Sequence, residues 1–270
     1  MRKIIVVLLL VLTLGLFACN EDKSGKFVVG MECGYAPFNW TETEKTDTNV
    51  PISNLEGAYA EGYDVQVAKI IAEELGLELE IKALAWDALI QNLNTGGIDM
   101  IIAGMSPTEE RLQSIDFTVS YYESTHVMLV KKDSPYANAT KLSDFTGATV
   151  IGQTGTIYAD LVPQVVAAGA TAGNNLATVP QIVAVILRGD VHATIVEEPV
   201  AKGICSQYSE LKYIVLTDGF EVADEDKIVS IGVRKNYELT DQINEVLQNI
   251  ITESVIANLL EPDFNNAPSE

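Results

Sequence analysis

Residues 88–104 read ALIQNLNTGGIDMIIAG, and this stretch decides the fold class of the chain. Residues 86–94 are predicted as a helix, which the glycine pair of the quoted stretch ends. The apolar run 98–103 follows directly and is predicted as a buried strand. A helix that leads straight into a buried strand indicates a parallel sheet covered by helices.

The segments before this stretch show the same alternation of strand and helix. The apolar run 27–29 is predicted as a short strand. A helix is predicted over 62–75, where apolar residues recur at helical spacing, and Gly76 ends it. Apolar and charged residues alternate over 77–83, which predicts a strand with one face in solvent. This order of elements predicts an α/β fold.

A weak internal repeat follows in the second half of the chain. Residues 182–198 read IVAVILRGDVHATIVEE and repeat the order of helix, glycine and strand. Each of the two strands leads into an unusual loop, at 104–107 and at 197–199. Two such units facing each other would place ligand groups at the carboxyl ends of their strands. Any α/β protein can show such a weak repeat by chance, and the sequence alone leaves that alternative open.

Composition sets the class of protein and excludes several functions. The chain has 270 residues, of which 47% are hydrophobic and 20% charged, so it can bury a large core. Lys and Arg number 17 against 38 Asp and Glu, which excludes nucleic-acid binding because phosphates require a basic surface. Two histidines and three cysteines, without a CxxC or HExxH pattern, predict no metal site, and we expect no bound cofactor.

The N-terminal residues are predicted to be a targeting segment rather than part of the fold. Two basic residues precede a short apolar run that ends at Cys19. The last residues of this run, LFAC, resemble the bacterial lipobox, in which the cysteine is lipidated and begins the mature chain. We therefore expect a signal peptide over 1–18 and a lipid-anchored polar tether over 19–26. A plain signal peptide with an incidental cysteine is the alternative.

Two apolar, extended segments, 127–130 and 228–233, are predicted to cross between two lobes, because each is flanked by charged residues. Two connections allow the lobes to close about a hinge and suppress free rotation. The predicted boundaries are 27–124 plus 226–260 for lobe 1, 125–225 for lobe 2 and 261–270 for a polar tail.

A set of short motifs, in one order and spacing, resembles those of a known family. The motifs are YAPF at 35–38, GYDV at 62–65, WDALI at 86–90, ID at 98–99, AGMSPTEER at 103–111, DFT at 116–118, YYES at 121–124 and VKK at 130–132. Together they resemble the polar amino-acid-binding family of ABC-importer solute-binding proteins. The resemblance implies a two-lobed, periplasmic-binding-protein-like (type II) fold with a mainly parallel sheet in each lobe and two extended hinge crossings. It also implies a monomer outside the cytoplasm that delivers a free amino acid to a membrane permease.

The resemblance assigns ligand binding to nine residues, which are Glu32, Tyr35, Trp86, Gly104, Ser106, Arg111, Gln153, Thr156 and Glu197. Arg111 matches the arginine that grips the ligand α-carboxylate, a role for which a guanidinium presents two parallel donors. Without the resemblance, Arg111 would be a solvated helix residue paired with a neighbouring glutamate. The backbone N–H groups of Ser106 and Thr156, near expected helix starts, favour the same carboxylate. Ordinary N-capping is the alternative for both.

The ligand ammonium is assigned to Glu197, where the family has an aspartate, and to the carbonyl group of Gly104. The missing side chain of Gly104 permits close approach of a ligand. Glu198 is the neighbouring candidate, and one of the two glutamates is expected to be a solvated charge. Cys33 and Cys205 fall in different predicted lobes and are expected to be free thiols, because a disulfide would restrict opening.

The ligand side chain is assigned to a sandwich between the rings of Tyr35 and Trp86, which suits a cation or an aliphatic stem. A core position is the alternative for Trp86. Glu32 matches an acidic position that meets the far end of cationic side chains, and a solvated loop acid is its alternative. Gln153 and Tyr158 are expected to add polar contacts.

These assignments favour arginine or lysine as the ligand, because Glu32 and the net charge of -21 both suit a cation. A glutamine-binding member of the same family is one alternative. An enzyme that resembles the cyclohexadienyl dehydratases, which share the fold, is the other. Such an enzyme needs a general acid, and Glu197 or Glu198 would be the candidate.

Overall fold

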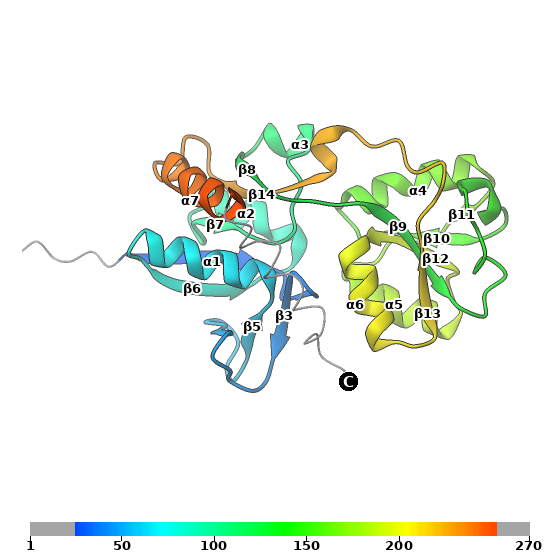
Figure 1. Cartoon of the computed structure of the whole chain (residues 1–270), viewed down its shortest axis with the longest axis horizontal. Helices are drawn as coiled ribbons and strands as arrows, with labels where there is room; N and C mark the ends of the chain where they lie inside the picture. The colour runs from blue at the N-terminus through cyan, green and yellow to red at the C-terminus, as the bar shows by residue number, and fades with distance from the viewer. Residues whose placement is uncertain (1–24, 253–270) are drawn as a thin grey trace, which may run out of the picture.

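The computed structural model describes residues 25–252, which form two lobes, each built on a five-stranded sheet (Figure 1). The sheet of lobe 1 contains, in spatial order, β6 (Glu78–Ala83), β1 (Lys26–Met31), β7 (Met100–Ile101), β14 (Ile228–Val233) and β8 (Asp116–Glu123). The sheet of lobe 2 contains β11 (Thr171–Ala172), β10 (Thr149–Ile151), β12 (Ala193–Glu197), β9 (His126–Lys131) and β13 (Leu211–Ile214). The predicted two-lobed α/β architecture is confirmed.

The two sheets have the same arrangement of strands. In each, the second strand pairs parallel with the first and third strands, as β1 does with β6 and β7 and β10 does with β11 and β12. The fourth strand, β14 or β9, pairs antiparallel with both of its neighbours. Both sheets are therefore mixed and not mainly parallel as expected, because only three strands of each pair in parallel. β14 and β9 are each reached through a lobe crossing instead of a covering helix, and such a connection does not impose parallel pairing.

Helices cover the sheets of both lobes. Those of lobe 1 are α1 (Tyr63–Glu74), α2 (Leu89–Asn94), α3 (Glu109–Leu112) and α7 (Thr240–Thr252). Those of lobe 2 are α4 (Ile157–Ala167), α5 (Val179–Arg188) and α6 (Glu198–Gln207). Short 3-10 turns lie at Trp86–Ala88, Leu142–Phe145 and Asp224–Asp226. In lobe 1, α1 packs on β6, α2 on β1 and β7, and α7 on β8, so that the apolar side chains between them form its core.

The strand predicted over 98–103 is shorter in the structure. Only Met100 and Ile101 form β7, although the apolar residues of the run are buried. At the start of the run, the carboxylate of Asp99 accepts the N–H of Val28 at 3.0 Å. A side chain thus takes the place that a backbone carbonyl would have in a longer ladder.

A small third sheet, which the sequence analysis missed, lies beside lobe 1 (Figure 1). Its strands, in spatial order, are β2 (Gly34–Tyr35), β3 (Asn39–Glu42), β5 (Tyr59–Glu61) and β4 (Val50–Pro51). These strands are too short to show a periodic pattern in the sequence. The sheet matters for function because β2 carries Tyr35.

The chain passes between the lobes twice, as the green and orange segments of Figure 1 show. β8 continues through Ser124 and Thr125 into β9, and residues 215–227 connect β13 with β14. The backbone N–H of Ser124 donates to the carbonyl of Lys227 at 2.8 Å, so the two crossings are hydrogen-bonded to each other. The lobe boundaries expected from the sequence remain predictions, and the tail at 261–270 lies outside the described residues.

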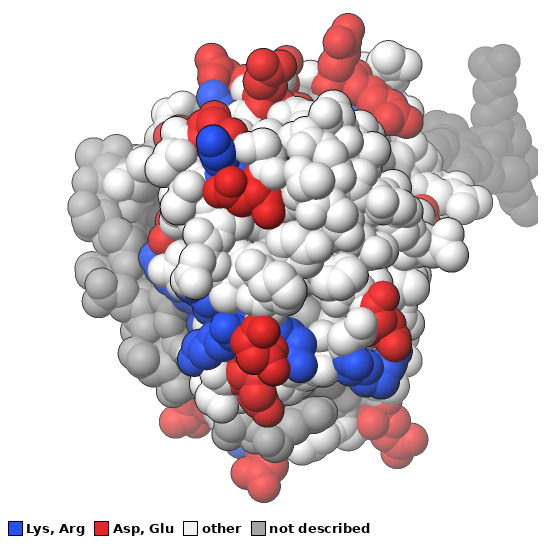
Figure 2. All heavy atoms as spheres, turned by 90° about the vertical axis from the view of Figure 1, so that its right-hand side faces the viewer, with Lys and Arg blue, Asp and Glu red and all other residues white. Residues whose placement is uncertain are grey.

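Charge is unevenly distributed over the molecule. Figure 2 looks onto the lobe 2 side and shows a broad uncharged area with charged groups around it. The segment 161–187, which includes all of β11 and most of α4 and α5, contains no Lys, Arg, Asp or Glu. The excess of acidic residues is therefore carried by the rest of the chain.

Candidate ligand site between the lobes

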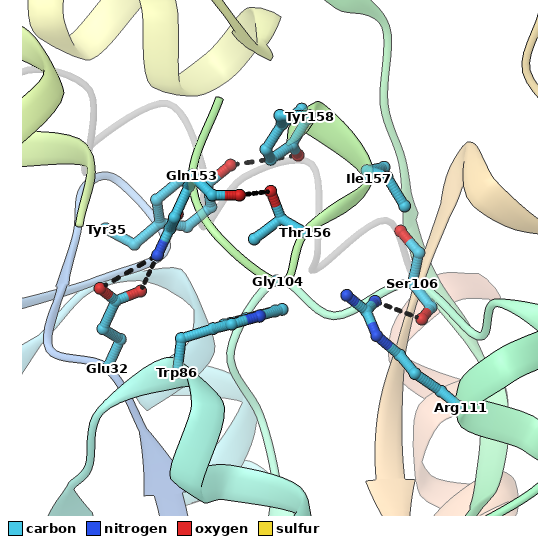
Figure 3. Close-up of a pocket in the computed structure, with 10 residues that line it drawn as sticks. All are labelled: Glu32, Tyr35, Trp86, Gly104, Ser106, Arg111, Gln153, Thr156, Ile157 and Tyr158. Atoms are coloured by element: carbon cyan, nitrogen blue, oxygen red, sulfur yellow. Dashed lines mark hydrogen bonds between the residues drawn. The ribbon is translucent and has the colours of Figure 1, made fainter. Parts of the chain in front are cut away.

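A cavity lies between the two lobes (Figure 3). The residues that line it are Glu32, Tyr35, Trp86, Gly104, Ser106, Arg111, Gln153, Thr156, Ile157 and Tyr158. They include all of the predicted ligand residues except Glu197, which contacts Tyr35. The structure thus brings the predicted residues together, while their roles toward a ligand stay a prediction.

The cavity lies at the carboxyl ends of strands from both sheets. Glu32 follows β1, Trp86 follows β6 and Gly104 follows β7 in lobe 1. Gln153 follows β10 and Glu197 ends β12 in lobe 2. Ligand groups gather at this edge because parallel strands end side by side there and their loops leave the sheet together.

Glu32 and Gln153 contact each other across the cavity (Figure 3). The amide nitrogen of Gln153 lies 3.2 and 3.0 Å from the two carboxylate oxygens of Glu32, and it also donates to the carbonyl of Ala177 at 3.0 Å. Burial raises the pKa of the Glu32 carboxyl above its ordinary value, and the hydrogen bond from Gln153 opposes that rise. The partner of Glu32 is neutral, so this carboxylate keeps a charge that a cationic group can balance.

Arg111 turns its guanidinium toward the cavity and not toward the neighbouring glutamates. Its Nη1 donates to the carbonyl of Ser106 at 2.8 Å, and its Nη2 to the carbonyl of Gly155 in lobe 2 at 3.2 Å. The guanidinium carbon lies 5.2 Å from the centre of the Trp86 ring, a cation–π arrangement. Burial lowers the pKa of the guanidinium, which still stays protonated at neutral pH.

Glu197 forms a buried cluster with two tyrosines. Tyr35 Oη lies 2.8 Å from Glu197 Oε2 and 3.2 Å from Tyr158 Oη. The pKa of the Glu197 carboxyl is raised to about 7. Burial is the main cause, the hydrogen bonds from the two tyrosine hydroxyl groups oppose the rise, and the charge of Asp64 adds to it. Glu198 instead forms an ion pair with Lys202 at 2.9 Å. Of the two candidate glutamates, Glu197 is therefore the one next to the cavity.

The aromatic and glycine residues of lobe 1 fix the shape of the cavity. Trp86 Nε1 donates to the carbonyl of Gly155 at 2.8 Å, and the ring of Tyr35 stacks on that of Phe38 at 5.7 Å between centroids. Gly104 has a φ of +61°, and a Cβ there would lie 3.1 Å from the Tyr35 ring. Glycine is needed at 104 both for this backbone conformation and for this close approach.

Ser106 and Thr156 both lie near helix starts, as expected, but neither side chain caps a helix. Thr108, and not Ser106, is the N-cap of α3, and its side chain accepts the N–H of Arg111 at 3.3 Å. Ser106 precedes Pro107, which disfavours helical backbone at the residue before it. Thr156 is the N-cap of α4, but its hydroxyl donates to the carbonyl of Gln153 at 2.8 Å instead of capping the helix.

Two residues near the cavity were missed by the sequence analysis. Ile157, the first residue of α4, lines the cavity and was missed because an apolar residue at a helix start fits a core position. Asp64 lies behind the cavity wall and raises the pKa of Glu197. An acid at the start of a helix is ordinary, so the motif GYDV at 62–65 carried no sign of that contact.

Within residues 25–252 there is no group of three or more His, Cys, Asp or Glu placed to hold a metal ion. In the same part of the chain, no helix has the length and apolar character needed to cross a bilayer. Cys33 and Cys205 are free thiols, as expected. The signal peptide, Cys19 and most of the expected tether lie outside the described residues.

The sequence profile of the bacterial extracellular solute-binding proteins, family 3, matches residues 27–265. The chain belongs to this family. Among its relatives, the arginine-binding extracellular protein ArtP of Bacillus subtilis is 29% identical over 245 residues, which cover 88% of this chain and 88% of ArtP. The function of the family, binding a solute outside the cytoplasm, fits a cavity between two lobes.

Two solved structures illustrate the likeness. The amino acid ABC transporter substrate-binding protein AbpA of Streptococcus pneumoniae, bound to L-arginine, has a TM-score of 0.77 at 26% identity and covers 92% of this chain and 98% of its own. An ancestral arginine-binding protein bound to glutamine has a TM-score of 0.72 at 27% identity and covers 89% of this chain and 98% of its own.

Proposed function

We propose that the protein is the solute-binding component of an ABC amino-acid importer and that it closes its two lobes on a basic amino acid, arginine or lysine. The observation that carries this proposal is the charge pattern of one cavity. A guanidinium, Arg111, lies on one side and a carboxylate, Glu32, on another (Figure 3). A second carboxylate, Glu197, is hydrogen-bonded to Tyr35 of the cavity wall. An amino acid with a cationic side chain has one negative and two positive groups, which complement this pattern.

In this proposal each end of the ligand has its own partners. Arg111 binds the α-carboxylate together with backbone N–H groups at Ser106 and Thr156, because a guanidinium donates two parallel hydrogen bonds. Glu197 and the carbonyl of Gly104 accept from the α-ammonium. Glu32 meets the cationic end of the side chain, while Tyr35 and Trp86 pack on its stem.

The two crossings are proposed to be the hinge, with lobe 1 at 27–124 plus 226–260 and lobe 2 at 125–225. The hydrogen bond between Ser124 and Lys227 supports this, because it makes the two crossings move as one unit. The contacts of Gly155 with Trp86 and Arg111 then break when the lobes open.

Calorimetric titration of the purified protein with the twenty amino acids tests the function. We expect saturable binding of arginine and lysine, and a rise in melting temperature at saturating ligand because only the folded state binds. No binding of any amino acid would refute the proposal. Tighter binding of glutamine than of arginine would identify the alternative, which is supported by the ancestral relative whose structure holds glutamine.

The protein is proposed to be a binder without enzymatic activity. The group that could favour a dehydratase is Glu197, because a carboxyl whose pKa is raised to about 7 can donate a proton at neutral pH. Incubation with prephenate and with arogenate separates the two functions. We expect neither compound to be consumed, and turnover that Glu197→Gln abolishes would establish the enzyme instead.

Anchoring through Cys19 and a monomeric state complete the proposal. The motif LFAC and the polar residues that follow it support lipidation of Cys19. Metabolic labelling with a fatty-acid analogue tests this: we expect label on the wild type and none on Cys19→Ser. Label that persists in the variant would show that the anchor is elsewhere, and an unlabelled wild type would show that Cys19 is not lipidated. Light scattering of the purified protein checks the monomer.

A further inference from the structure

Asp64 is a fully buried acid that the proposed contacts with the ligand do not use. It lies in the first turn of α1, in the motif GYDV, and has no exposed surface. Its carboxylate accepts hydrogen bonds from the amide of Asn39 at 2.7 Å and from the hydroxyl of Tyr121 at 2.7 Å. It also accepts the backbone N–H of Gly104. The N-cap of α1 is Gly62 and no side chain caps this helix, so these partners serve the buried carboxylate and not a cap.

These partners connect Asp64 to both lobe 1 loops of the cavity. The side-chain oxygen of Asn39 accepts the backbone N–H of Cys33 at 2.8 Å, and Cys33 lies between Glu32 and Tyr35 in the sequence. Cys33 has a φ of +56°, a conformation that a non-glycine residue adopts only when its surroundings hold it. One carboxylate thus holds the Glu32–Tyr35 loop and the Gly104 loop in place together.

The charge of Asp64 is not cancelled by its hydrogen-bond partners, which are an amide, a phenol and a backbone N–H. Burial raises the pKa of Asp64 to about 6, and the three donors oppose the rise, so the carboxylate is ionised at neutral pH. Its potential reaches the far side of the cavity, because it raises the pKa of Glu197 in lobe 2.

We propose that Asp64 is a positioning residue of the ligand site: its ionised carboxylate aligns the Tyr35 and Gly104 loops and supplies, from behind the cavity wall, negative potential that favours the ligand ammonium. This inference rests on the proposed function, the binding of an amino acid. It adds a third acid to the recognition of positive charge, one that does not touch the ligand.

The other titratable groups around Asp64 are few. On its own helix the neighbour is Tyr63, on β8 it is Tyr121, in the loop after β1 it is Cys33, and on β12 it is Glu197. Burial raises the pKa of Cys33 to about 12 and of both tyrosines well above their ordinary value, so these three stay neutral near pH 6. Glu197 is the second group that titrates in the same range.

The test compares the affinity of the wild type and of Asp64→Asn across pH. The probe is whichever of arginine, lysine and glutamine the wild type binds most tightly, since all three carry the α-ammonium. At about pH 7.5 we expect the variant to bind about tenfold more weakly, the factor that corresponds to one pKa unit of coupling. As the pH falls through 6, the wild type protonates Asp64 and loses the same charge, so the ratio of the two dissociation constants approaches one.

The ratio of the two dissociation constants is the quantity to compare, because the protonation of Glu197 and of the ligand changes the affinity of both proteins and largely cancels in the ratio. Tyr63→Phe is the matched control, because it removes one buried hydrogen bond of the same segment, from Tyr63 to the carbonyl of Tyr121, and removes no hydrogen bond of Asp64. We expect the control to lose stability and to keep the affinity of the wild type. A ratio for Asp64→Asn that is constant over this pH range, or close to one throughout, overturns the proposal.

A second variant covers the case in which Asp64→Asn does not fold. Tyr121→Phe removes a hydrogen bond that lowers the pKa of Asp64, so the pH at which affinity falls on the acid side should move upward. An unshifted acid limb overturns the proposal. If the wild type binds no amino acid, the proposed function fails and this inference with it, whereas binding with an unchanged ratio overturns this inference alone.

Discussion

The guanidinium of Arg111 donates hydrogen bonds to carbonyl groups of both lobes, and a single substitution tests whether it binds the ligand carboxylate. We expect Arg111→Lys to weaken ligand binding by about 2 kcal/mol, because a lysine cannot form the two parallel hydrogen bonds that a carboxylate accepts. Calorimetry measures the loss. Arg188→Lys is the matched control, since Arg188 is exposed and pairs with Asp190 away from the cavity. Unchanged affinity in Arg111→Lys would exclude Arg111 as the carboxylate partner.

Glu32 decides the charge of the preferred ligand. Because its partner Gln153 is neutral, we expect Glu32→Gln to weaken arginine by about 2 kcal/mol or more and glutamine by much less. The measurement is a titration of both ligands against both proteins. Glu56→Gln makes the same change of charge at an exposed position and should affect neither ligand. Equal losses for the two ligands would show that Glu32 does not contact the side-chain end.

The turn from β10 into α4 sets the lobe 2 wall of the cavity. A Cβ on Gly152 would lie 2.5 Å from the backbone nitrogen of Ala159 in α4. We expect Gly152→Ala to lower the free energy of unfolding by about 1–3 kcal/mol, because the helix must move, and to weaken ligand binding as Thr156 and Tyr158 move with it. Thermal melts and calorimetry measure the two effects.

Gly203→Ala is the matched control for that substitution. Gly203 lies inside α6, where a Cβ would meet only ordinary contacts, the nearest at 3.7 Å from the carbonyl oxygen of Ala36. Alanine favours a helix by about 1 kcal/mol over glycine, so this variant should be at least as stable as the wild type. Equal melting temperatures for both variants would mean that the turn after β10 adapts without cost.

For the whole molecule, the two buried acids predict how stability depends on pH. Burial raises the pKa of Glu197 to about 7 and of Asp64 to about 6, whereas both ionise near pH 4 in an unfolded chain. Between these values the folded protein binds more protons than the unfolded chain, so the free energy of unfolding falls as the pH rises. We expect the protein without ligand to melt at a higher temperature at about pH 5 than at about pH 8.

Glu197→Gln checks the cause of that dependence. Removing the buried charge should raise the melting temperature at alkaline pH and flatten its slope with pH, while ligand binding is lost. A wild type that becomes more stable from acid to alkaline pH would contradict the assignment of raised pKa values. The variant is expected to gain stability and lose binding, because the wild type keeps the charge of Glu197 buried where the ligand needs it.

Elements with complete local signals were predicted well. α5 has Thr178 as N-cap, a proline in its first turn and Gly189 in the left-handed conformation at its end, and it matches the helix expected from the repeat at 182–198. The small sheet that carries Tyr35 was missed, because its strands of two to four residues are too short to show alternation. The mixed pairing of both sheets was also missed, because strand direction depends on where the chain crosses between lobes.

The alternation of strands and helices, the resemblance to the family and every residue that lines the cavity except Ile157 could be inferred from the sequence, because helix stops, buried strands and ordered motifs are local patterns along the chain. How those residues pair could not be inferred from the sequence, because the pairs form when the chain is folded. The tertiary structure placed Glu197 and not Glu198 beside Tyr35, gave Glu32 the neutral partner Gln153, and put Asp64 behind the wall. These pairs join residues far apart in the sequence, and their burial sets which charges stay uncancelled. Both depend on the packing of two lobes, which no local pattern encodes.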